Sequence, residues 1–73
     1  MIEVRLFAGL RQGRQKIYQM DSCSVSNVQD IMDTLSIQRS EVNILLINGF
    51  HQKPETPVKD GDIVSLFPAV GGG

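Results

Sequence analysis

Hydrophobic and polar residues alternate over residues 1–8, which indicates a strand with one buried face. Residues 9–13 are largely polar and bracketed by glycine, a composition typical of a hairpin turn. Residues 16–21 have the pattern of a second strand, and its closeness to the first predicts an antiparallel pair. The positions of the first strand expected to be buried are Ile2, Val4 and Leu6.

A helix is predicted over residues 27–35, where apolar positions recur at helical spacing. Ser26 has the character of its N-cap, Gln29 completes a capping box, and Val25 is placed to act as the hydrophobic staple. A helix of fewer than three turns is not stable alone, so we expect it to pack on a sheet. Its apolar face consists of Val28, Ile31, Met32 and Leu35.

The second half of the chain reads as strands and turns. A strand is predicted at residues 43–47, because its last four residues form an unbroken apolar run. Asn48 and Gly49, which follow it, are a strong signal for a tight turn. The stretch 50–62 is mostly loop, with a short edge strand expected around His51. The last strand is predicted at residues 63–67.

The order strand, strand, helix, strand, short strand, strand predicts an α+β fold of the β-grasp type. We expect a mixed sheet of four to five strands with one main helix across one face, and the first and last strands side by side. The domain should span residues 1–68, followed by a flexible tail at 69–73.

A chain of 73 residues with a net charge of −1 favours a binding or carrier module over a self-contained enzyme. Neither a nucleic-acid partner nor a membrane is indicated, and no apolar stretch has the length of a signal peptide or a membrane span, so we expect a cytoplasmic protein. Cys23, the only cysteine, is expected to be an ordinary, partly buried residue. His51 is the only histidine and lacks the partner ligands of a metal site. The basic residues near the start, expected on a solvated face, are Arg5, Arg11, Arg14 and Lys16.

The chain ends in three glycines, Gly71, Gly72 and Gly73, which form the slimmest and least restricted backbone available. Such a tail can pass through a narrow channel and deliver a terminal carboxylate to a buried site. An ATP-using partner could convert that carboxylate to an acyl-adenylate, open to a sulfur or nitrogen nucleophile. The alternative is an inert, disordered end.

The chain resembles the MoaD/ThiS family of ubiquitin-like sulfur carriers, and within it the small subunit of molybdopterin synthase. It departs from the family ending at Ala69, where the family has a second proline, and at Gly71. The segments that carry the likeness are VRLFA at 4–8, LR at 10–11, the helix at 26–35, ING at 47–49, TPVKDGD at 56–62 and FPAVGGG at 67–73.

The resemblance implies that a ubiquitin-activating-type enzyme uses ATP to adenylate Gly73, with Gly72 forming the narrow neck of the tail. A persulfide donor would then leave a thiocarboxylate, which a molybdopterin synthase large subunit or an equivalent acceptor enzyme would consume. The chain itself would be a carrier rather than an enzyme, with no bound cofactor or metal. Open alternatives are a sulfur carrier for thiamine or another metabolite, a protein modifier joined to lysines, and a plain interaction module.

The partner surface can be argued from the strands alone. If the first and last strands pair with their aliphatic positions toward the helix, Phe7 and Phe67 share the open face and form an apolar patch beside the tail. The residues expected to contact partners are therefore Phe7, Phe67, Pro68, Val70 and Gly71. The alternative is that these rings only broaden the core.

Overall fold

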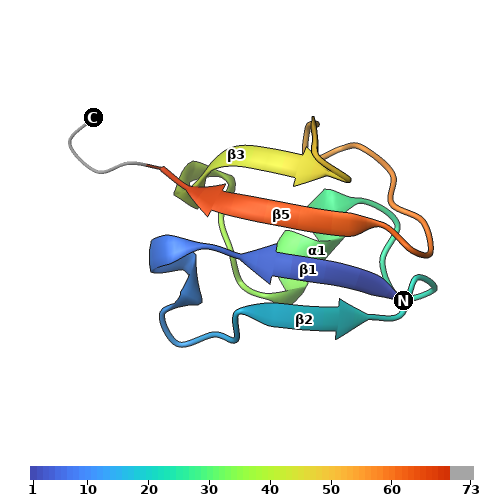
Figure 1. Ribbon diagram of the computed structural model, residues 1–73, viewed down its shortest axis with the longest axis horizontal. Coiled ribbons are helices and arrows are strands. Elements are labelled where there is room, and N and C mark those ends of the chain that lie inside the picture. The colour runs from blue at the N-terminus through green and yellow to red at the C-terminus, as the bar shows by residue number, and fades with distance from the viewer. Residues whose placement is uncertain (70–73) are drawn as a thin grey trace.

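The protein forms a five-stranded mixed sheet with one α-helix across one face (Figure 1). The computed structural model describes residues 1–69. Within them no helix is long and apolar enough to cross a membrane. The elements are β1 (Ile2–Leu6), η1 (Ala8–Arg11), β2 (Ile17–Met20), α1 (Val28–Thr34), η2 (Arg39–Glu41), β3 (Val42–Ile47), β4 (Phe50–His51) and β5 (Ile63–Pro68), where η denotes a 3₁₀-helix.

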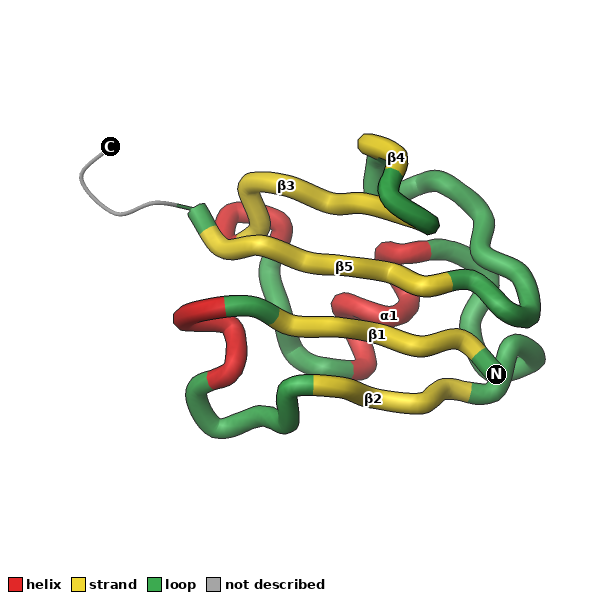
Figure 2. The backbone as a smooth tube through the Cα atoms, viewed as in Figure 1, coloured by secondary structure: helices red, strands yellow, loops and turns green. Residues whose placement is uncertain are grey.

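The strand order is β2-β1-β5-β3-β4, so the last strand occupies the centre of the sheet. β1 and β5 run parallel, with Val4 opposite Val64 and Leu6 opposite Leu66. The remaining pairs are antiparallel. Figure 2 shows the helix lying against the sheet and the long loop from β4 to β5 passing around one end. The expected α+β, β-grasp arrangement, including adjacent first and last strands, is confirmed.

The core lies between the sheet and α1, because alternate residues of the central strands point toward the helix. Five of these side chains, from β1 and β5, are fully buried at 0% exposure: Ile2, Val4, Leu6, Val64 and Leu66. The predicted alternation in the first strand and the predicted apolar face of the helix are both confirmed. The whole core consists of Ile2, Val4, Leu6, Leu10, Val25, Val28, Ile31, Met32, Ile37, Leu45, Ile47, Val64 and Leu66.

The helix begins one residue later than the capping pattern predicts. Asn27, not Ser26, is the N-cap: its side-chain Oδ1 accepts a hydrogen bond from the Asp30 N–H at 2.9 Å. The Asp30 carboxylate in turn accepts from the Ser26 N–H at 2.8 Å. A single bridge between Asn27 and Pro57 holds Asn27 in an extended conformation, so helical geometry starts only at Val28.

Removing this cap should cost measurable stability. We expect Asn27→Ala to lower the free energy of unfolding by about 1 kcal/mol, because the Asp30 N–H loses its acceptor. Urea unfolding followed by circular dichroism measures the change. Ser26→Ala is the matched control and should be close to neutral. A larger loss for the Ser26 variant than for the Asn27 variant would restore Ser26 as the cap.

The two predicted turns differ in outcome. Asn48 and Gly49 have φ values of +53° and +88° and join β3 to β4, as the dipeptide predicts. Residues 9–13 are predicted as a simple turn, but residues 9–11 belong to the 3₁₀-helix η1, and Leu10 within it is only 2% exposed. The apolar Leu10 side chain draws this connection inward, where it joins the core.

A docking face beside the carboxyl-terminal strand

The open face of the sheet carries an aromatic pair. Phe7 directly follows β1 and Phe67 lies in β5, and because these strands run side by side the two rings stack, with centroids 4.3 Å apart and planes 9° from parallel. Both side chains are half-buried. Stacked rings on a sheet surface offer a large, rigid apolar area at low entropic cost to a partner.

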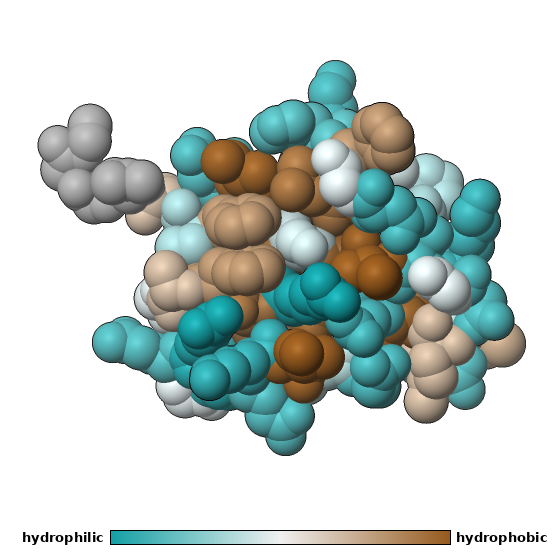
Figure 3. Space-filling view, viewed as in Figure 1, coloured by the Kyte–Doolittle hydropathy of each residue, from teal (hydrophilic) through white to brown (hydrophobic). Residues whose placement is uncertain are grey.

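The register of β3 against β5 extends this apolar area. Ile44 lies opposite Phe67, and Leu46 lies opposite Ser65, so both aliphatic side chains share the open face with the rings. Figure 3 shows apolar side chains gathered on this face over the neighbouring strands. The open-face patch, as we call it below, consists of Phe7, Ile44, Leu46 and Phe67.

Basic side chains border the patch on the β1–β2 side. Arg11 donates from Nε to the Leu6 carbonyl at 2.8 Å, and its guanidinium carbon lies 5.5 Å from the centroid of the Phe7 ring. Arg5 donates to Glu3, and this hydrogen bond lowers the pKa of Glu3 below its usual 4.5. These cations give the apolar surface a positive border. A shallow hollow of about 220 Å³ lies among Arg5, Leu6, Phe7, Arg11, Lys16 and Ile17.

The end of β5 is fixed by main-chain bonds. Pro68 lies opposite Val42 in the sheet, after an irregularity in the register between Val42 and Ile44. The Ala69 N–H donates to the Glu41 carbonyl at 3.0 Å, and Pro68 is half-buried. The chain is therefore held against β3 and η2 up to Ala69, one residue beyond the boundary expected between domain and tail.

Arg14 was expected on a solvated face, but its side chain is largely buried and bonds to main-chain carbonyl groups at the end of α1. Its guanidinium donates to the carbonyls of Leu10, Leu35 and Ser36 at 3.2, 3.1 and 3.1 Å, and its side chain is only 20% exposed. The last turn of α1 contains no basic residue. A cation from elsewhere in the chain therefore satisfies the carbonyl groups that follow this helix.

A family model described as the ThiS family matches residues 4–73, almost the whole chain. The chain belongs to the ThiS family. It is thus a small ubiquitin-like carrier of the MoaD/ThiS type, in agreement with the likeness of its strands, turn and ending to that family. No curated protein sequence matches it significantly.

Solved structures share the fold over their full length. SAMP1 from Haloferax volcanii is 25% identical, with 99% of this chain and 98% of that chain covered and a TM-score of 0.74. A chain in the complex of subunits 1 and 2 of the molybdopterin-converting factor from Helicobacter pylori is 24% identical, covers 99% and 97%, and has a TM-score of 0.66. A chain in the BexX/CysO complex from Amycolatopsis orientalis is 22% identical, covers 100% of both and has a TM-score of 0.71.

In this ThiS-family protein the structure brings together three of the seven residues that the sequence singled out. Phe7 and Phe67 stack on the open face, and Pro68 follows Phe67 as the last residue of β5. Val70, Gly71, Gly72 and Gly73 lie outside the described residues. The aliphatic members of the open-face patch, Ile44 and Leu46, were not singled out, although their place in an apolar run two residues apart was the available signal.

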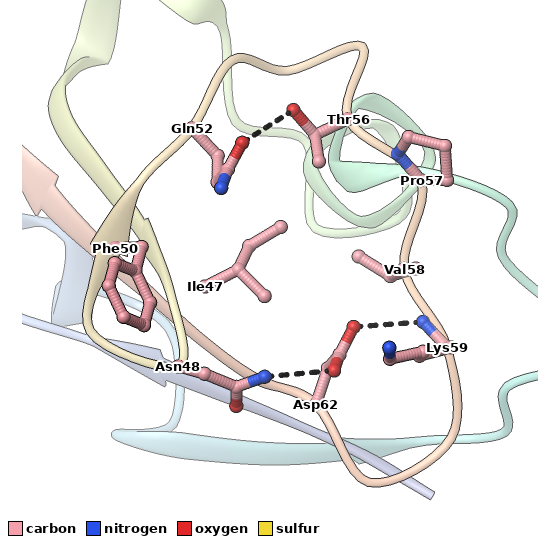
Figure 4. A pocket seen from close by; sticks show the side chains of 9 residues that line it. All are labelled: Ile47, Asn48, Phe50, Gln52, Thr56, Pro57, Val58, Lys59 and Asp62. Carbon is pink, nitrogen blue, oxygen red and sulfur yellow. Dashed lines mark hydrogen bonds between the residues drawn. The ribbon is translucent and has the colours of Figure 1, made fainter.

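A hollow of about 470 Å³ lies at the opposite end of the sheet, between the β3–β4 turn and the loop before β5 (Figure 4). Its buried carboxylate, Asp62, is engaged by the side-chain amide of Asn48 and the main-chain N–H of Lys59, each at 3.0 Å. Asn48 also accepts from the Ile63 N–H at 3.0 Å. These bonds tie two turns together, so Asp62 serves the structure of this end of the sheet.

Cys23 is exposed, so the expectation of a partly buried residue is wrong. It lies in a turn where its N–H donates to the Asp21 carboxylate at 2.9 Å, and this turn directs the thiol to solvent. His51 is exposed in β4. Among residues 1–69, no three His, Cys, Asp or Glu side chains are placed to hold a metal ion.

Proposed function

We propose that this protein is a sulfur carrier whose Gly73 carboxylate is activated and converted to a thiocarboxylate. A carboxylate oxygen attacks the α-phosphorus of ATP bound to a ubiquitin-activating-type enzyme, and pyrophosphate leaves. The terminal sulfur of a donor persulfide then attacks the acyl-adenylate carbonyl and displaces AMP. A thiol cleaves the resulting acyl disulfide, which leaves the thiocarboxylate on Gly73 and a disulfide on the donor side.

The observation that carries this proposal is the family match, which runs through the three glycines to residue 73. The main-chain bond from Ala69 to Glu41 supports it, because it fixes where the chain leaves the sheet. Three of the four residues that follow are glycines, the residue type that places the fewest restrictions on the backbone. Gly72 forms the narrow neck and Gly73 carries the reacting carbonyl.

We propose that the open-face patch, with Pro68, Val70 and Gly71, forms the docking surface for the activating enzyme and the acceptor enzyme. Phe7 and Phe67 are half-buried, and aromatic side chains of this kind are common anchors of protein interfaces. Two of the similar structures are complexes with a second protein, which supports a role for this fold in assembly. In this proposal the activating partner binds the ATP, and the carrier contributes its terminal carboxylate.

The acceptor that we propose is the large subunit of molybdopterin synthase, which uses the thiocarboxylate sulfur to build the dithiolene of the molybdenum or tungsten cofactor. The Phe67-Pro68 pair, typical of that branch of the family, favours it over the thiamine branch. Likeness to the molybdopterin-converting factor chain supports this choice at the level of the fold.

A second candidate is a protein modifier, and the likeness to SAMP1, a small archaeal modifier protein, favours it. Activation would be the same, but a lysine amine would attack the acyl-adenylate, displace AMP and give an isopeptide bond. The two candidates therefore diverge only after Gly73 has been adenylated.

The deciding experiment is intact mass after incubation with ATP, a sulfide source and the cognate activating enzyme. We expect a gain equal to exchanging one oxygen for one sulfur, abolished by deleting Gly72 and Gly73. The Cys23→Ser variant is the matched control, since oxidation of the exposed Cys23 thiol to a sulfenic acid by dissolved oxygen would add nearly the same mass. It should gain the same mass as the unsubstituted protein.

The other outcomes separate the candidates. Adducts joined through lysine would support the modifier. An unchanged mass with an enzyme that activates its own carrier would overturn the proposal and leave the tail inert.

A further inference from the structure

Two basic side chains beside the open-face patch lack an acidic partner in the described part of the chain. Arg11 and Lys16 are exposed, and neither forms an ion pair within residues 1–69. The third cation of this border, Arg5, is paired with Glu3. A protein with a net charge of −1 therefore holds two uncompensated positive charges beside its proposed docking surface.

The Arg11 guanidinium is oriented before any partner binds. Its Nε donates to the Leu6 carbonyl at 2.8 Å, and its guanidinium carbon lies 5.5 Å from the centroid of the Phe7 ring. Within residues 1–69, neither of its two Nη groups donates a hydrogen bond. A guanidinium presents its donors in a fixed planar fork that matches a carboxylate. Because this fork is already held in place, little side-chain entropy is lost when a carboxylate binds to it.

Main-chain bonds hold Lys16 at the same place. Its carbonyl accepts from the Leu6 N–H at 2.8 Å, which fixes the start of β2 against the end of β1. The Gln15 N–H just before it donates to the Tyr18 hydroxyl at 2.9 Å. The backbone around Lys16 is therefore anchored on both sides, and its flexible side chain adds a second positive charge to the hollow that Arg11 also lines.

The hollow between these cations has apolar walls. Phe7 and Ile17 both line it, and Ile17 shares the open face because it lies opposite Arg5 in the register. The Ile17 side chain is 49% exposed. The hollow has a volume of about 220 Å³, below the roughly 300 Å³ at which typical small-molecule sites begin. Apolar walls flanked by cations fit a protein segment in which an aliphatic side chain lies between two carboxylates.

The hollow and the open-face patch form one continuous surface, because Phe7 belongs to both. Figure 3 shows hydrophilic side chains next to the apolar area of this face. A protein that docks on the patch therefore extends over the hollow on the β1–β2 side. The activating enzyme is the partner that the carrier and the modifier functions have in common.

On the basis of the function proposed above, we propose that an acidic segment of the activating enzyme fills this hollow. Its carboxylates pair with Arg11 and Lys16. An aliphatic side chain between them packs on Phe7 and Ile17. Complementary charge then selects the partner and speeds its association, while the aromatic pair supplies most of the affinity.

The test is isothermal titration calorimetry of the full chain with its cognate activating enzyme. We expect Arg11→Gln to weaken binding about tenfold, because it removes a pair of charge-assisted hydrogen bonds. Lys16→Gln should weaken binding about threefold, because a single exposed ion pair contributes less. Lys59→Gln is the matched control: it removes the same charge from an exposed side chain at the opposite end of the sheet and should leave the affinity unchanged.

Salt gives a readout that a loss of packing would not change. The affinity of the unsubstituted protein should fall as sodium chloride rises from about 20 mM to about 300 mM, because salt screens exposed charges. This dependence should be weaker for Arg11→Gln and Lys16→Gln and retained by Lys59→Gln. Lys16 is exposed, so its variant tests the proposal even where Arg11→Gln disturbs the Phe7 ring.

The contrary outcomes are distinct. Affinities and salt dependences that are the same for all three variants would overturn this proposal and leave the proposed function in place. Weaker binding to the acceptor enzyme alone would assign the hollow to that enzyme and equally contradict the proposal. An activating enzyme that neither binds nor adenylates the unsubstituted protein would overturn the proposed function, and this proposal with it.

Discussion

Phe7→Asp should weaken binding to the activating enzyme about 30-fold, because a central aromatic anchor contributes about 2 kcal/mol or more to an interface. The substitution removes the ring that stacks on Phe67 and places a carboxylate in the middle of the open-face patch. The partner would have to desolvate that charge without pairing it. Isothermal titration calorimetry with the activating enzyme measures the loss.

The matched control is Phe50→Asp. Phe50 is 70% exposed in β4 and lies at the hollow near the β3–β4 turn, away from the patch. The same change there should leave the affinity within about threefold. Both variants need an unfolding curve, because Phe7 is half-buried. A folded Phe7→Asp variant that binds as well as the control would show that the stacked rings only broaden the core.

Leu66→Ala should lower the free energy of unfolding by about 2–5 kcal/mol. Leu66 is fully buried in the central strand, paired with Leu6 on one side and Leu45 on the other, so the cavity has little room to collapse. A domain of this size has on the order of 5 kcal/mol in total. The variant should therefore retain at most about 3 kcal/mol, and at the upper end of the expected loss about half of the population is unfolded at 25 °C.

Urea unfolding with two independent probes measures this loss. Ser65→Ala, one residue away on the open face, is the matched control and should change stability by about 0.5 kcal/mol or less. Equal effects at the two positions would mean that the alternation of the central strand does not determine the core.

The sequence was most informative where local pattern and global fold agree. The alternation at Ile2, Val4 and Leu6 predicted the buried face of β1, and the aliphatic positions of β5 followed the same rule. Placing the first and last strands side by side then brought Phe7 and Phe67 to one face. Their stacking required no information beyond the strand order and the period of two.

Two of the three features that the sequence predicted wrongly depend on contacts between distant segments. The bridge from Asn27 to Pro57 moved the helix start, and no local pattern records it. Arg14 satisfies the carbonyl groups of Leu35 and Ser36, which lie 21 and 22 residues later in the chain, so its spacing from other basic residues was uninformative. The exposure of Cys23 follows from an Asx turn that the serines around it did not distinguish from other turns.

The central place of β5 has a consequence for synthesis on the ribosome. Until residues 63–68 have emerged, β1 and β3 have no strand between them, and only the pair β1–β2 and the short pair β3–β4 can form. A lone hairpin of this kind is marginal in water. Folding must therefore wait for nearly the whole chain, and because the contacts that close the sheet are distant in sequence it should be slow for so small a domain. A nascent chain that ends before residue 63 lacks the central strand of its sheet and remains open to proteases. A folded molecule is therefore one whose synthesis has passed residue 68, just before the glycines.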